Sequence, residues 1–438
     1  MNSARLVLAE RQVPRYTSYP TAPHFHPGIG PREYADWLAA LPAEATLSLY
    51  LHVPFCQAMC AYCGCHTKVV RRPEPIEAYL AALLAEIELV SDATAARRVT
   101  HLHWGGGTPT MLGLPGMARV MEALARRFDL SALAEHAIEL DPRAMTEETA
   151  RGLAGLGTNR ASLGVQDFNA AVQRAIGRIQ PYDVVAAAVE HLRRHGIRSI
   201  NLDLMYGLPL QDREGLLRSL ELAHGLAPDR IALFGYAHVP WMKKHQRLIE
   251  EGTLPGPQAR LMQAEAARSL LLGLGYMGVG LDHFARPEDE LARAAREGRL
   301  RRNFQGYTTD AADALIGLGA SAIGRLPQGF VQNRPDLRAY RAAIAAGRFA
   351  TQRGKALSAD DLLRGAIIER LMCDFAVEVD RAMLEEVRPR LAPLAEQGIV
   401  TLRGGRIVVT AEGRPFVRLV AAAFDAYLDQ AGRHSAAV

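Results

Sequence analysis

The 438-residue chain has no hydrophobic run long enough to cross a membrane, which takes about 18 residues. Its first segment, MNSARLVLAERQVPRY, also lacks the apolar stretch and the cleavage pattern of an export signal. The net charge is only +4, from 51 Lys and Arg against 47 Asp and Glu, so neither sign is in large excess. We therefore expect a cytoplasmic protein with neither a membrane nor a nucleic acid as a partner.

Cysteine is scarce and unevenly distributed. Four of the five cysteines, Cys56, Cys60, Cys63 and Cys65, fall within ten residues, and Cys373 lies far away. A zinc site would usually need a second pair of ligands, and none follows. Structural disulfides would need an oxidising compartment, which nothing in the sequence indicates. The spacing C-x3-C-x2-C therefore predicts a loop that holds an iron–sulfur cluster.

Three thiolates can bind three irons of a 4Fe–4S cluster and leave the fourth iron without a protein ligand. Such an open iron can bind and reduce a small molecule. We predict Cys56, Cys60 and Cys63 as the metal ligands. Cys65 comes only two residues after Cys63, so we expect it to lie beside the cluster without binding it. With the aromatic Tyr62 before the third cysteine, the run resembles the signature of radical S-adenosylmethionine (SAM) enzymes.

Short apolar runs alternate with longer helical patterns from about residue 46 onward. This alternation predicts right-handed crossovers and a parallel sheet. Six such units favour a partial (β/α)6 barrel, an α/β fold, over a closed barrel of eight units. The expected strands are 46–53, 99–104, 136–140, 161–165, 199–207 and 230–239, and the expected helices are 75–90, 115–128, 146–156, 181–195, 211–227 and 257–275.

Polar residues follow the predicted strands at their carboxyl ends, where barrels carry their chemistry. The cysteine loop follows the first strand, and WGGGTP (104–109) ends the second. Its three glycines would let the backbone approach a ligand, because no Cβ stands in the way. It lacks the Lys-Ser/Thr of a phosphate-binding loop. The polar residues of the next three strands are Glu139 and Asp141, then Gln166 and Asp167, then Asp203.

The two ends of the chain differ from the barrel pattern. Residues 1–45 predict an irregular N-terminal arm, followed by the barrel and its extension at 46–345. Residues 355–438 predict a helical, winged-helix-like domain. Its segment LEEVRPRLAPLAEQG has no dense basic face, so we expect a packing or substrate-covering role rather than DNA binding. The elements expected there are helices at about 358–373 and 413–431 and a hairpin at 401–410.

Motifs from the ends and the middle of the chain narrow the resemblance further. Three of them are RYTSYPTAP (15–23), CAYCGC (60–65) and NFQGYTT (303–309). Together they resemble the oxygen-independent coproporphyrinogen III oxidase family, because related radical SAM proteins usually share the core without these parts. Further matching motifs are LHVPFC (51–56), HWGGGTPT (103–110), IELDPR (138–143), GVQDFN (164–169), NLDLMYGLP (201–209) and MGVGLDHFARPEDELA (277–292).

The resemblance implies a partial (β/α)6 radical SAM barrel with an N-terminal arm and a C-terminal helical or winged-helix-like domain. It implies oxidative decarboxylation of two propionates of coproporphyrinogen III to vinyl groups, giving protoporphyrinogen IX in haem biosynthesis. The implied cofactors are a 4Fe–4S cluster and two SAM molecules. The implied contacts of the first SAM are Tyr50, Gly106, Glu139 and Ile323, and those of the second are Tyr62, Gly107, Thr108, Gln166, Arg178, Asp203 and Ala237.

No side chain is predicted as a catalytic residue, since the radical chemistry belongs to the cofactors. A flavodoxin- or ferredoxin-like electron donor, an unidentified electron acceptor and a monomeric state complete the expectation. Because the substrate carries four carboxylates, Arg15 and Arg302 are candidates to bind them, and His283 is a candidate to cover the site.

Three alternative functions use parts of the same pattern. A haem chaperone of this kind would carry the cluster but transfer haem without decarboxylation, and the motifs RYTSYPT and NFQGYTT argue against it. A radical SAM enzyme that opens or methylates haem is the second alternative. An RNA-modifying enzyme is the third, and it would need a basic groove that the sequence does not indicate.

Overall fold

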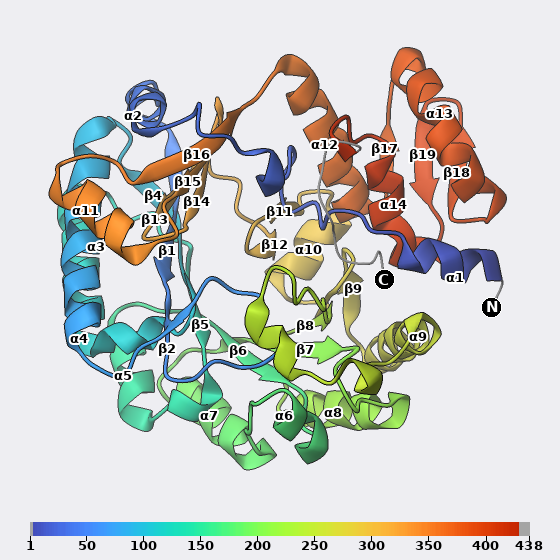
Figure 1. Ribbon diagram of the computed structural model, residues 1–438, viewed down its shortest axis with the longest axis horizontal. Helices are drawn as coiled ribbons and strands as arrows, with labels where there is room; N and C mark the ends of the chain where they lie inside the picture. The colour runs from blue at the N-terminus through green and yellow to red at the C-terminus, as the bar shows by residue number, and fades with distance from the viewer. Residues whose placement is uncertain (1–2, 429–438) are drawn as a thin grey trace.

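The computed structural model describes residues 3–428 of the chain (Figure 1). All six predicted strands are present, and neighbouring strands within this set of six are parallel. The last of them ends at Gly235 instead of residue 239, because the amide of Val239 leaves the sheet and donates to Gln246 Oε1 at 2.6 Å. The six strands are β1 (Thr46–Val53), β4 (Arg98–Gly106), β5 (Glu135–Leu140), β6 (Arg160–Gln166), β7 (Ser199–Tyr206) and β8 (Arg230–Gly235).

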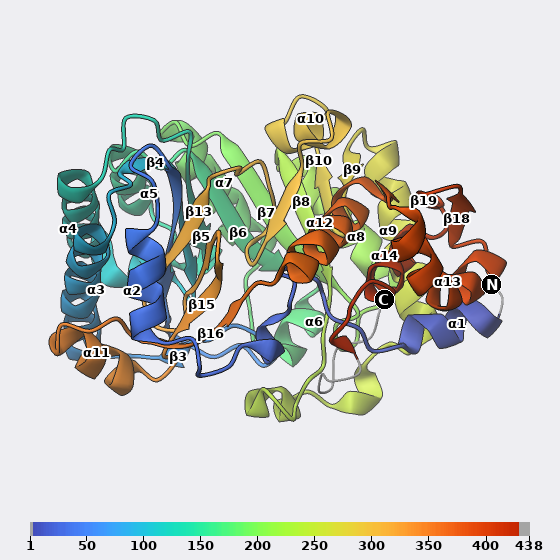
Figure 2. The same cartoon turned by 90° about the horizontal axis from the view of Figure 1, so that it is seen from above.

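The six predicted helices are also present and cover the outer face of the curved sheet (Figures 1 and 2). Side-chain caps stabilise the starts of two of them. Thr146 Oγ1 accepts from the amide of Thr149 at 3.1 Å, and Asp212 accepts from the amide of Gly215 at 2.6 Å. The helices are α3 (Glu74–Ala93), α4 (Gly113–Arg127), α5 (Glu147–Gly155), α7 (Tyr182–Arg194), α8 (Arg213–Gly225) and α9 (Pro257–Gly273).

A seventh parallel strand, β13 (Ala314–Leu318), pairs with β1 and was not predicted. Further strands extend the sheet in antiparallel fashion: β14 (Ile323–Leu326), β15 (Gly329–Asn333) and β16 (Thr351–Ala356) at one edge, and β10 (His283–Ala285) and β9 (Met277–Val279) at the other. The complete order is β16-β15-β14-β13-β1-β4-β5-β6-β7-β8-β10-β9. Because β16 and β9 lie at opposite edges, the barrel is partial, as predicted.

The main core lies between the parallel strands and their outer helices. Leu47, Leu49 and Leu51 of β1 are all completely buried. They alternate with Ser48, Tyr50 and His52, so the three leucines share one face of the sheet. Trp104 at the end of β4 is also completely buried, and its Nε1 donates to His136 Nε2 at 2.9 Å. The carboxyl ends of the strands are therefore held on a rigid support.

The N-terminal arm contains two helices, α1 (Ser3–Glu10) and α2 (Pro31–Ala39), so the prediction of an irregular arm was wrong for these segments. At the start of α2, the amide of Gly30 donates to Glu33 Oε2 at 2.8 Å. Leu8 and Val13 of the arm pack in one apolar cluster with the C-terminal domain. The N-terminal arm thus lies against the C-terminal domain (Figure 1).

The C-terminal domain contains the predicted first helix, as α12 (Ala359–Asp374), and the predicted hairpin. The last helix is shorter than predicted, because α14 covers only Val417–Ala422 and the predicted end at 431 lies outside the described residues. The proposed division at 1–45, 46–345 and 355–438 stays a prediction. The remaining elements of the domain are β17 (Ala376–Glu378), α13 (Arg381–Glu396), β18 (Val400–Arg403) and β19 (Arg406–Val409).

The rest of the chain adds short elements to the barrel. Across residues 3–428, no helix combines the length and the apolar character that a membrane span requires. The additional elements are β2 (Phe55–Cys56), β3 (Lys68–Val69), α6 (Ala170–Ala175), α10 (Glu290–Arg296), β11 (Arg301–Asn303), β12 (Gly306–Thr308) and α11 (Leu337–Ala345).

Candidate active site

The cysteine loop and the glycine-rich loop lie side by side at the carboxyl ends of β1 and β4. The amide of Gly107 donates to the carbonyl of Val53 at 2.8 Å, and the amide of Thr108 donates to the carbonyl of Phe55 at 2.7 Å. These bonds continue the pairing of β1 with β4 beyond the strands themselves. The two motifs that the sequence placed on neighbouring strands are therefore in direct contact.

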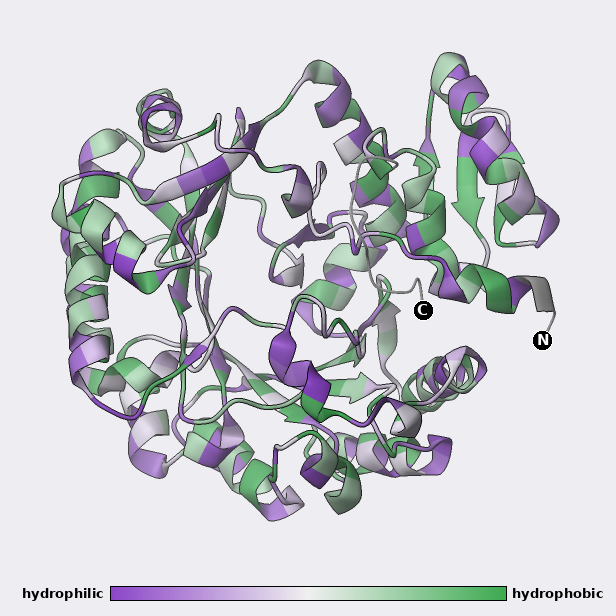
Figure 3. Cartoon of the chain, viewed as in Figure 1, coloured by the Kyte–Doolittle hydropathy of each residue, from purple (hydrophilic) through white to green (hydrophobic). Residues whose placement is uncertain are grey.

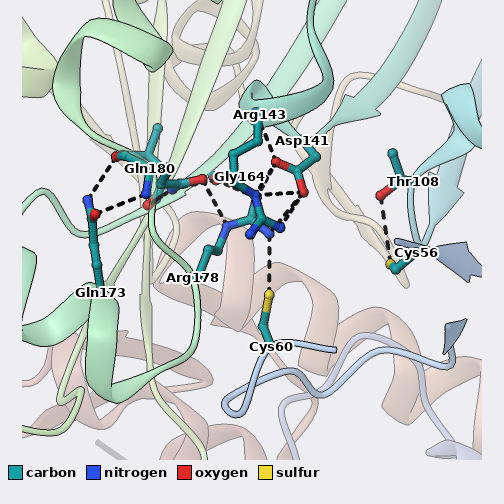
Figure 4. A network of polar contacts seen from close by, with 10 residues as sticks. Cys56, Cys60, Thr108, Asp141, Arg143, Gly164, Gln173, Arg178 and Gln180 are labelled. Atoms are coloured by element: carbon teal, nitrogen blue, oxygen red, sulfur yellow. Dashed lines mark hydrogen bonds and ion pairs between the residues drawn. The ribbon is translucent and has the colours of Figure 1, made fainter. Parts of the chain in front are cut away.

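Each of the three predicted ligand sulfurs receives a hydrogen bond from a different group. Thr108 Oγ1 donates to Cys56 Sγ at 3.7 Å, and Arg178 Nη1 donates to Cys60 Sγ at 3.6 Å (Figure 4). The amide of Cys65 donates to Cys63 Sγ at 3.4 Å. Hydrogen bonds to sulfur favour the thiolate, which is the form that binds iron.

The thiol of Cys63 is the one most strongly biased towards the thiolate. Its hydrogen bonds with Cys65 outweigh the effect of burial and lower its pKa to about 6. For Cys56, burial instead raises the pKa of the thiol. Cys65 itself is solvent-accessible at the cavity inside the barrel, and its amide orients Cys63.

The three thiols do not converge on one point. In residues 3–428, no set of three His, Cys, Asp or Glu side chains is placed to hold a single metal ion. A zinc site would need its ligands around one centre. In a 4Fe–4S cluster, each thiolate binds a different iron, so three separate sulfurs with donors to each of them fit this cofactor.

A polar segment from β8 to α9 binds the backbone of the cysteine loop, and sequence reasoning did not find it. His245 Nε2 donates to the carbonyl of Cys63 at 2.7 Å, and Lys243 Nζ donates to that of Cys65 at 2.9 Å. The buried Gln246 completes the set from the same short turn. The turn is strongly hydrophilic (Figure 3), so its sequence reads as an ordinary surface loop.

Gln246 brings two predicted SAM-contact residues together. Its Nε2 donates to the carbonyl of Tyr62 at 2.9 Å and to that of Ala237 at 3.3 Å. Gln246 is only 1% exposed, so this bridge is shielded from water. The backbone positions of Tyr62 and Ala237 are thereby fixed relative to each other.

The three glycines of the WGGGTP loop each lie against a protein neighbour. A Cβ on Gly107 would lie 2.4 Å from the carbonyl oxygen of Phe55. A Cβ on Gly105 would lie 2.9 Å from Glu139 Oε1, and Gly106 has a φ of 112° beside the ring of His52. Glycine is therefore needed at these three positions for packing within the protein itself, whether or not a ligand is bound.

Glu139 is ionised and points along the glycine loop. Its Oε2 accepts from the amide of Gly106 at 3.1 Å, and its Oε1 hydrogen-bonds His103 Nε2 at 3.3 Å. Burial raises the pKa of Glu139, but the bonds from His103 and Gly106 outweigh it and hold the pKa below its ordinary value. Tyr50 stacks on His103 with ring centroids 5.8 Å apart. A carboxylate in this position can accept from an ammonium group.

Ile323 reaches the same place from the other side of β1. Gly317 of β13 is paired with Tyr50, and a Cβ on Gly317 would lie 2.7 Å from the backbone of Ile323. The glycine thus allows β14 to cross close to β13. Ile323 therefore lies beside the strand position that is paired with Tyr50, and the role of both residues as SAM contacts stays a prediction.

Arg178 is buried in a network that joins the later strands to the cysteine loop (Figure 4). Its Nη2 donates to the carbonyl of Gly164 at 2.8 Å, and its Nε donates to Gln180 Oε1 at 3.0 Å. Asp141 lies 3.4 Å from the same guanidinium. Arg178 therefore faces the sulfur of Cys60 in this structure, although it follows the fourth barrel strand in sequence.

A cavity of about 320 Å³ fills the barrel interior, and Glu139, Asp203, His283 and Cys65 line it. Burial raises the pKa of Asp203 to about 6. Within residues 3–428, four buried polar atoms of its lining residues have no hydrogen-bond partner, Asn201 Oδ1, Gln305 Oε1, Arg160 Nη1 and Arg230 Nη2. Such unsatisfied atoms fit a polar ligand.

The two predicted polar residues at the end of β6, Gln166 and Asp167, lie in different settings. Gln166 has a φ of 67° at a bulge in the pairing of β6 with β7, which turns it out of the strand pattern. Asp167 is completely buried and accepts from Gln211 Nε2 at 2.6 Å and from Ser219 Oγ at 3.0 Å. Asp167 is therefore a structural residue of the barrel.

Known proteins resemble the chain over almost its whole length. It is 51% identical over 441 residues to an oxygen-independent coproporphyrinogen III oxidase of Bradyrhizobium diazoefficiens, with 98% of each chain covered. It is 42% identical to that of Escherichia coli, covering 96% of this chain and 94% of the relative. A solved structure of the coproporphyrinogen III oxidase of Escherichia coli, described as a radical SAM enzyme, matches with a TM-score of 0.90 and 40% identity over 95% of this chain and 100% of that one.

Two family comparisons cover separate parts of the chain. Residues 50–223 match the Radical SAM superfamily, and residues 357–416 match the HemN C-terminal domain. The partial barrel with its three-thiol loop is thus that of a radical SAM protein. Within that class, the chain belongs to the oxygen-independent coproporphyrinogen III oxidase family, as its motifs predicted.

Proposed function

We propose that this chain is an oxidoreductase that converts coproporphyrinogen III to protoporphyrinogen IX without oxygen. The observation that carries the proposal is the loop of three separate thiols, each with its own hydrogen-bond donor, beside the glycine loop and an ionised Glu139. Each of two propionates would lose CO2, one hydrogen atom and one electron, which leaves a vinyl group. The alternatives that handle haem or RNA find no specific support in the described residues.

Cys56, Cys60 and Cys63 are the proposed ligands of a 4Fe–4S cluster. When bound, the cluster and SAM supply the 5′-deoxyadenosyl radical that removes a hydrogen atom from the propionate. The protein holds the sulfurs in place through Thr108 and Arg178, whose donors stabilise negative charge on sulfur.

The first SAM is proposed to lie between Tyr50, Gly106, Glu139 and Ile323. Glu139 would accept from its ammonium group, because the carboxylate is ionised and already lies against the glycine loop. The contacts proposed for a second SAM are Tyr62, Gly107, Thr108, Gln166, Arg178, Asp203 and Ala237.

The partners of the reaction stay proposals from the sequence. They are a flavodoxin- or ferredoxin-like electron donor and an electron acceptor of unassigned identity. A monomer in the cytoplasm, with no membrane or nucleic acid bound, is part of the same proposal.

The test is anaerobic reconstitution of the chain with iron and sulfide, followed by reaction with SAM, a reductant and coproporphyrinogen III. Product masses should fall in two steps, each by CO2 and two hydrogens, through a monovinyl intermediate. Deuterium placed at the propionate β-carbons should appear in 5′-deoxyadenosine. An unchanged substrate together with tight haem binding would contradict the proposal in favour of the chaperone.

A further inference from the structure

A second cavity, of about 400 Å³, lies beside the ends of β7 and β8, against the N-terminal arm, α9 and the C-terminal domain. Three carboxylates line it, from Glu10, Glu265 and Asp282. Six guanidinium groups also line this cavity, so we call it the arginine cavity. They belong to Arg15, Arg260, Arg268, Arg302, Arg414 and Arg418.

Backbone carbonyls, which carry no net charge, anchor three of these arginines, Arg15, Arg302 and Arg418. Arg15 Nη2 donates to the carbonyl of Gly235 at 2.9 Å, and Arg302 Nε donates to that of Tyr16 at 3.2 Å. Arg302 Nη1 is buried and has no hydrogen-bond partner in the part of the chain that the structure describes. A hydrogen-bond donor is thus left for a ligand.

The arginines also weaken one another's charged form. Arg418 is only 5% exposed, and burial together with the charge of Arg15 lowers its pKa to about 9. Burial and the nearby Arg414 likewise lower the pKa of Arg268. Cations gathered in this way, with too few carboxylates between them, attract an anionic ligand.

The arginine cavity adjoins the barrel interior. Phe234 lines both this cavity and the one that contains Glu139 and Asp203. Its ring meets that of His283 edge to face, with centroids 5.6 Å apart. A ligand anchored by the arginines can therefore extend past Phe234 towards the proposed SAM site.

We propose that the arginine cavity binds the propionates of coproporphyrinogen III that are not reacting, while a reacting propionate extends past Phe234 into the barrel. This rests on the function proposed above. Guanidinium groups bind carboxylates through paired hydrogen bonds. Tyr206, Tyr236 and Trp241 of the cavity wall supply aromatic faces for the pyrrole rings.

The test titrates coproporphyrin III, the fluorescent oxidised form of the substrate, into the anaerobically reconstituted full-length protein without SAM. Mesoporphyrin IX, with two propionates instead of four, is the matched ligand. The variants are Arg15→Gln and Arg268→Gln, and Arg268→Lys tests whether charge alone restores binding. The control is Arg381→Gln, because the Arg381 side chain is 92% exposed on α13.

Wild type should bind coproporphyrin III more tightly than mesoporphyrin IX. Each Gln variant should raise the Kd for coproporphyrin III about 10-fold, which is the effect of losing one charge-assisted hydrogen bond. The ratio of the Kd for mesoporphyrin IX to the Kd for coproporphyrin III should shrink in the same variants, whereas Arg381→Gln should bind both porphyrins as wild type does. Circular dichroism and iron content identify any variant that has merely unfolded, and the Lys variant should recover part of the affinity.

Absence of coproporphyrin binding in wild type, or unchanged affinity in both Gln variants, overturns the proposal. SAM also carries a carboxylate, so SAM is titrated in parallel. Weaker binding of SAM with unchanged binding of coproporphyrin would make the cavity a SAM site and equally overturn the proposal. Arginine-dependent porphyrin binding in a protein that cannot decarboxylate coproporphyrinogen III would refute the proposed function and leave the carboxylate site standing.

Discussion

The imidazole of His245 donates from Nε2 to the carbonyl oxygen of Cys63 at 2.7 Å, across 182 residues of chain. This bond fixes the backbone on which a proposed iron ligand is carried. Groups that orient a metal ligand usually affect how firmly the metal is held. The polar turn that contains His245 therefore belongs to the support of the cluster.

Replacing His245 with alanine should loosen the cysteine loop by about 1 kcal/mol, the value of one hydrogen bond. The cluster should then bleach faster in air, which absorption and iron content would follow. Lys244→Ala is the matched control, because Lys244 is exposed on the same turn. Equal bleaching rates in both variants would show that His245 does not hold the loop.

Cys65→Ser should keep the cluster, whereas Cys56→Ser, Cys60→Ser or Cys63→Ser should lose it. Cys65 contributes its amide to Cys63 Sγ, and serine keeps that amide. The measurement is iron content and the visible absorption of the reconstituted proteins. Loss of iron in Cys65→Ser alone would make Cys65 a ligand.

Arg178→Lys should lower turnover about 10-fold or more, because lysine keeps the charge but loses the planar fork. The fork now bonds Gly164, Gln180 and Cys60 at once. The electron paramagnetic resonance signal of the reduced cluster should change as well. Arg143→Lys is the control, since Arg143 pairs with Asp141 but, within residues 3–428, donates no hydrogen bond to a cysteine sulfur. Identical spectra in wild type and Arg178→Lys would separate Arg178 from the cluster.

Gly107→Ala should destabilise the loops by about 1–3 kcal/mol, because the added Cβ meets the carbonyl of Phe55 at 2.4 Å. Cluster content should fall with it. At Gly155, at the end of α5, a Cβ would meet nothing within 4 Å. Gly155→Ala should therefore be neutral or slightly stabilising. The readout is thermal unfolding together with iron content, and equal behaviour of both variants would contradict the packing argument.

Glu86 of α3 should make stability depend on pH. It accepts from the amide of Gly319 at 2.6 Å, from Asn333 Nδ2 at 2.6 Å and from Tyr340 at 2.8 Å, and burial raises its pKa to about 7. The carboxyl group of Glu86 loses its proton near pH 4.5 in the unfolded chain and near pH 7 in the folded chain. Between these values the folded state binds more protons, so the free energy of unfolding falls as pH rises, by up to about 1.4 kcal/mol per pH unit.

Glu86→Gln should remove this part of the pH dependence. The measurement is urea unfolding of the cluster-free protein at pH 5 and at pH 7.5, because the difference between the two proteins isolates this group. If the free energy of unfolding changed equally with pH in both proteins, Glu86 would be ionised over the whole range from pH 5 to pH 7.5.

The sequence predicted the barrel because its strands and helices alternate in long, uninterrupted units. The strand β13 was missed because Gly317 and Gly319 interrupt its apolar run, although Gly317 is needed for the approach of Ile323. The arm helix α2 was missed because prolines and histidines surround it, although proline is well tolerated at the first position of a helix, where Pro31 stands.

In the candidate active site as well, the sequence predicted what is local and missed what joins distant segments. The cysteine and glycine motifs are local in sequence, so their spacing predicted both loops. The bond from His245 and the gathering of Arg15 with Arg418 join segments that only the folded chain brings together. A lone arginine or histidine in a polar stretch carries no local signal for such a contact.

The wall of the arginine cavity is shared by the first and last parts of the chain. Arg418 donates to the carbonyl of Pro14 at 3.0 Å, whereas the strands that carry the cysteine loop lie between residues 46 and 318. During synthesis, chains emerge and fold from the N-terminus. The barrel segments thus leave the ribosome before Arg418 does, so the cysteine loop can fold before the arginine cavity is complete.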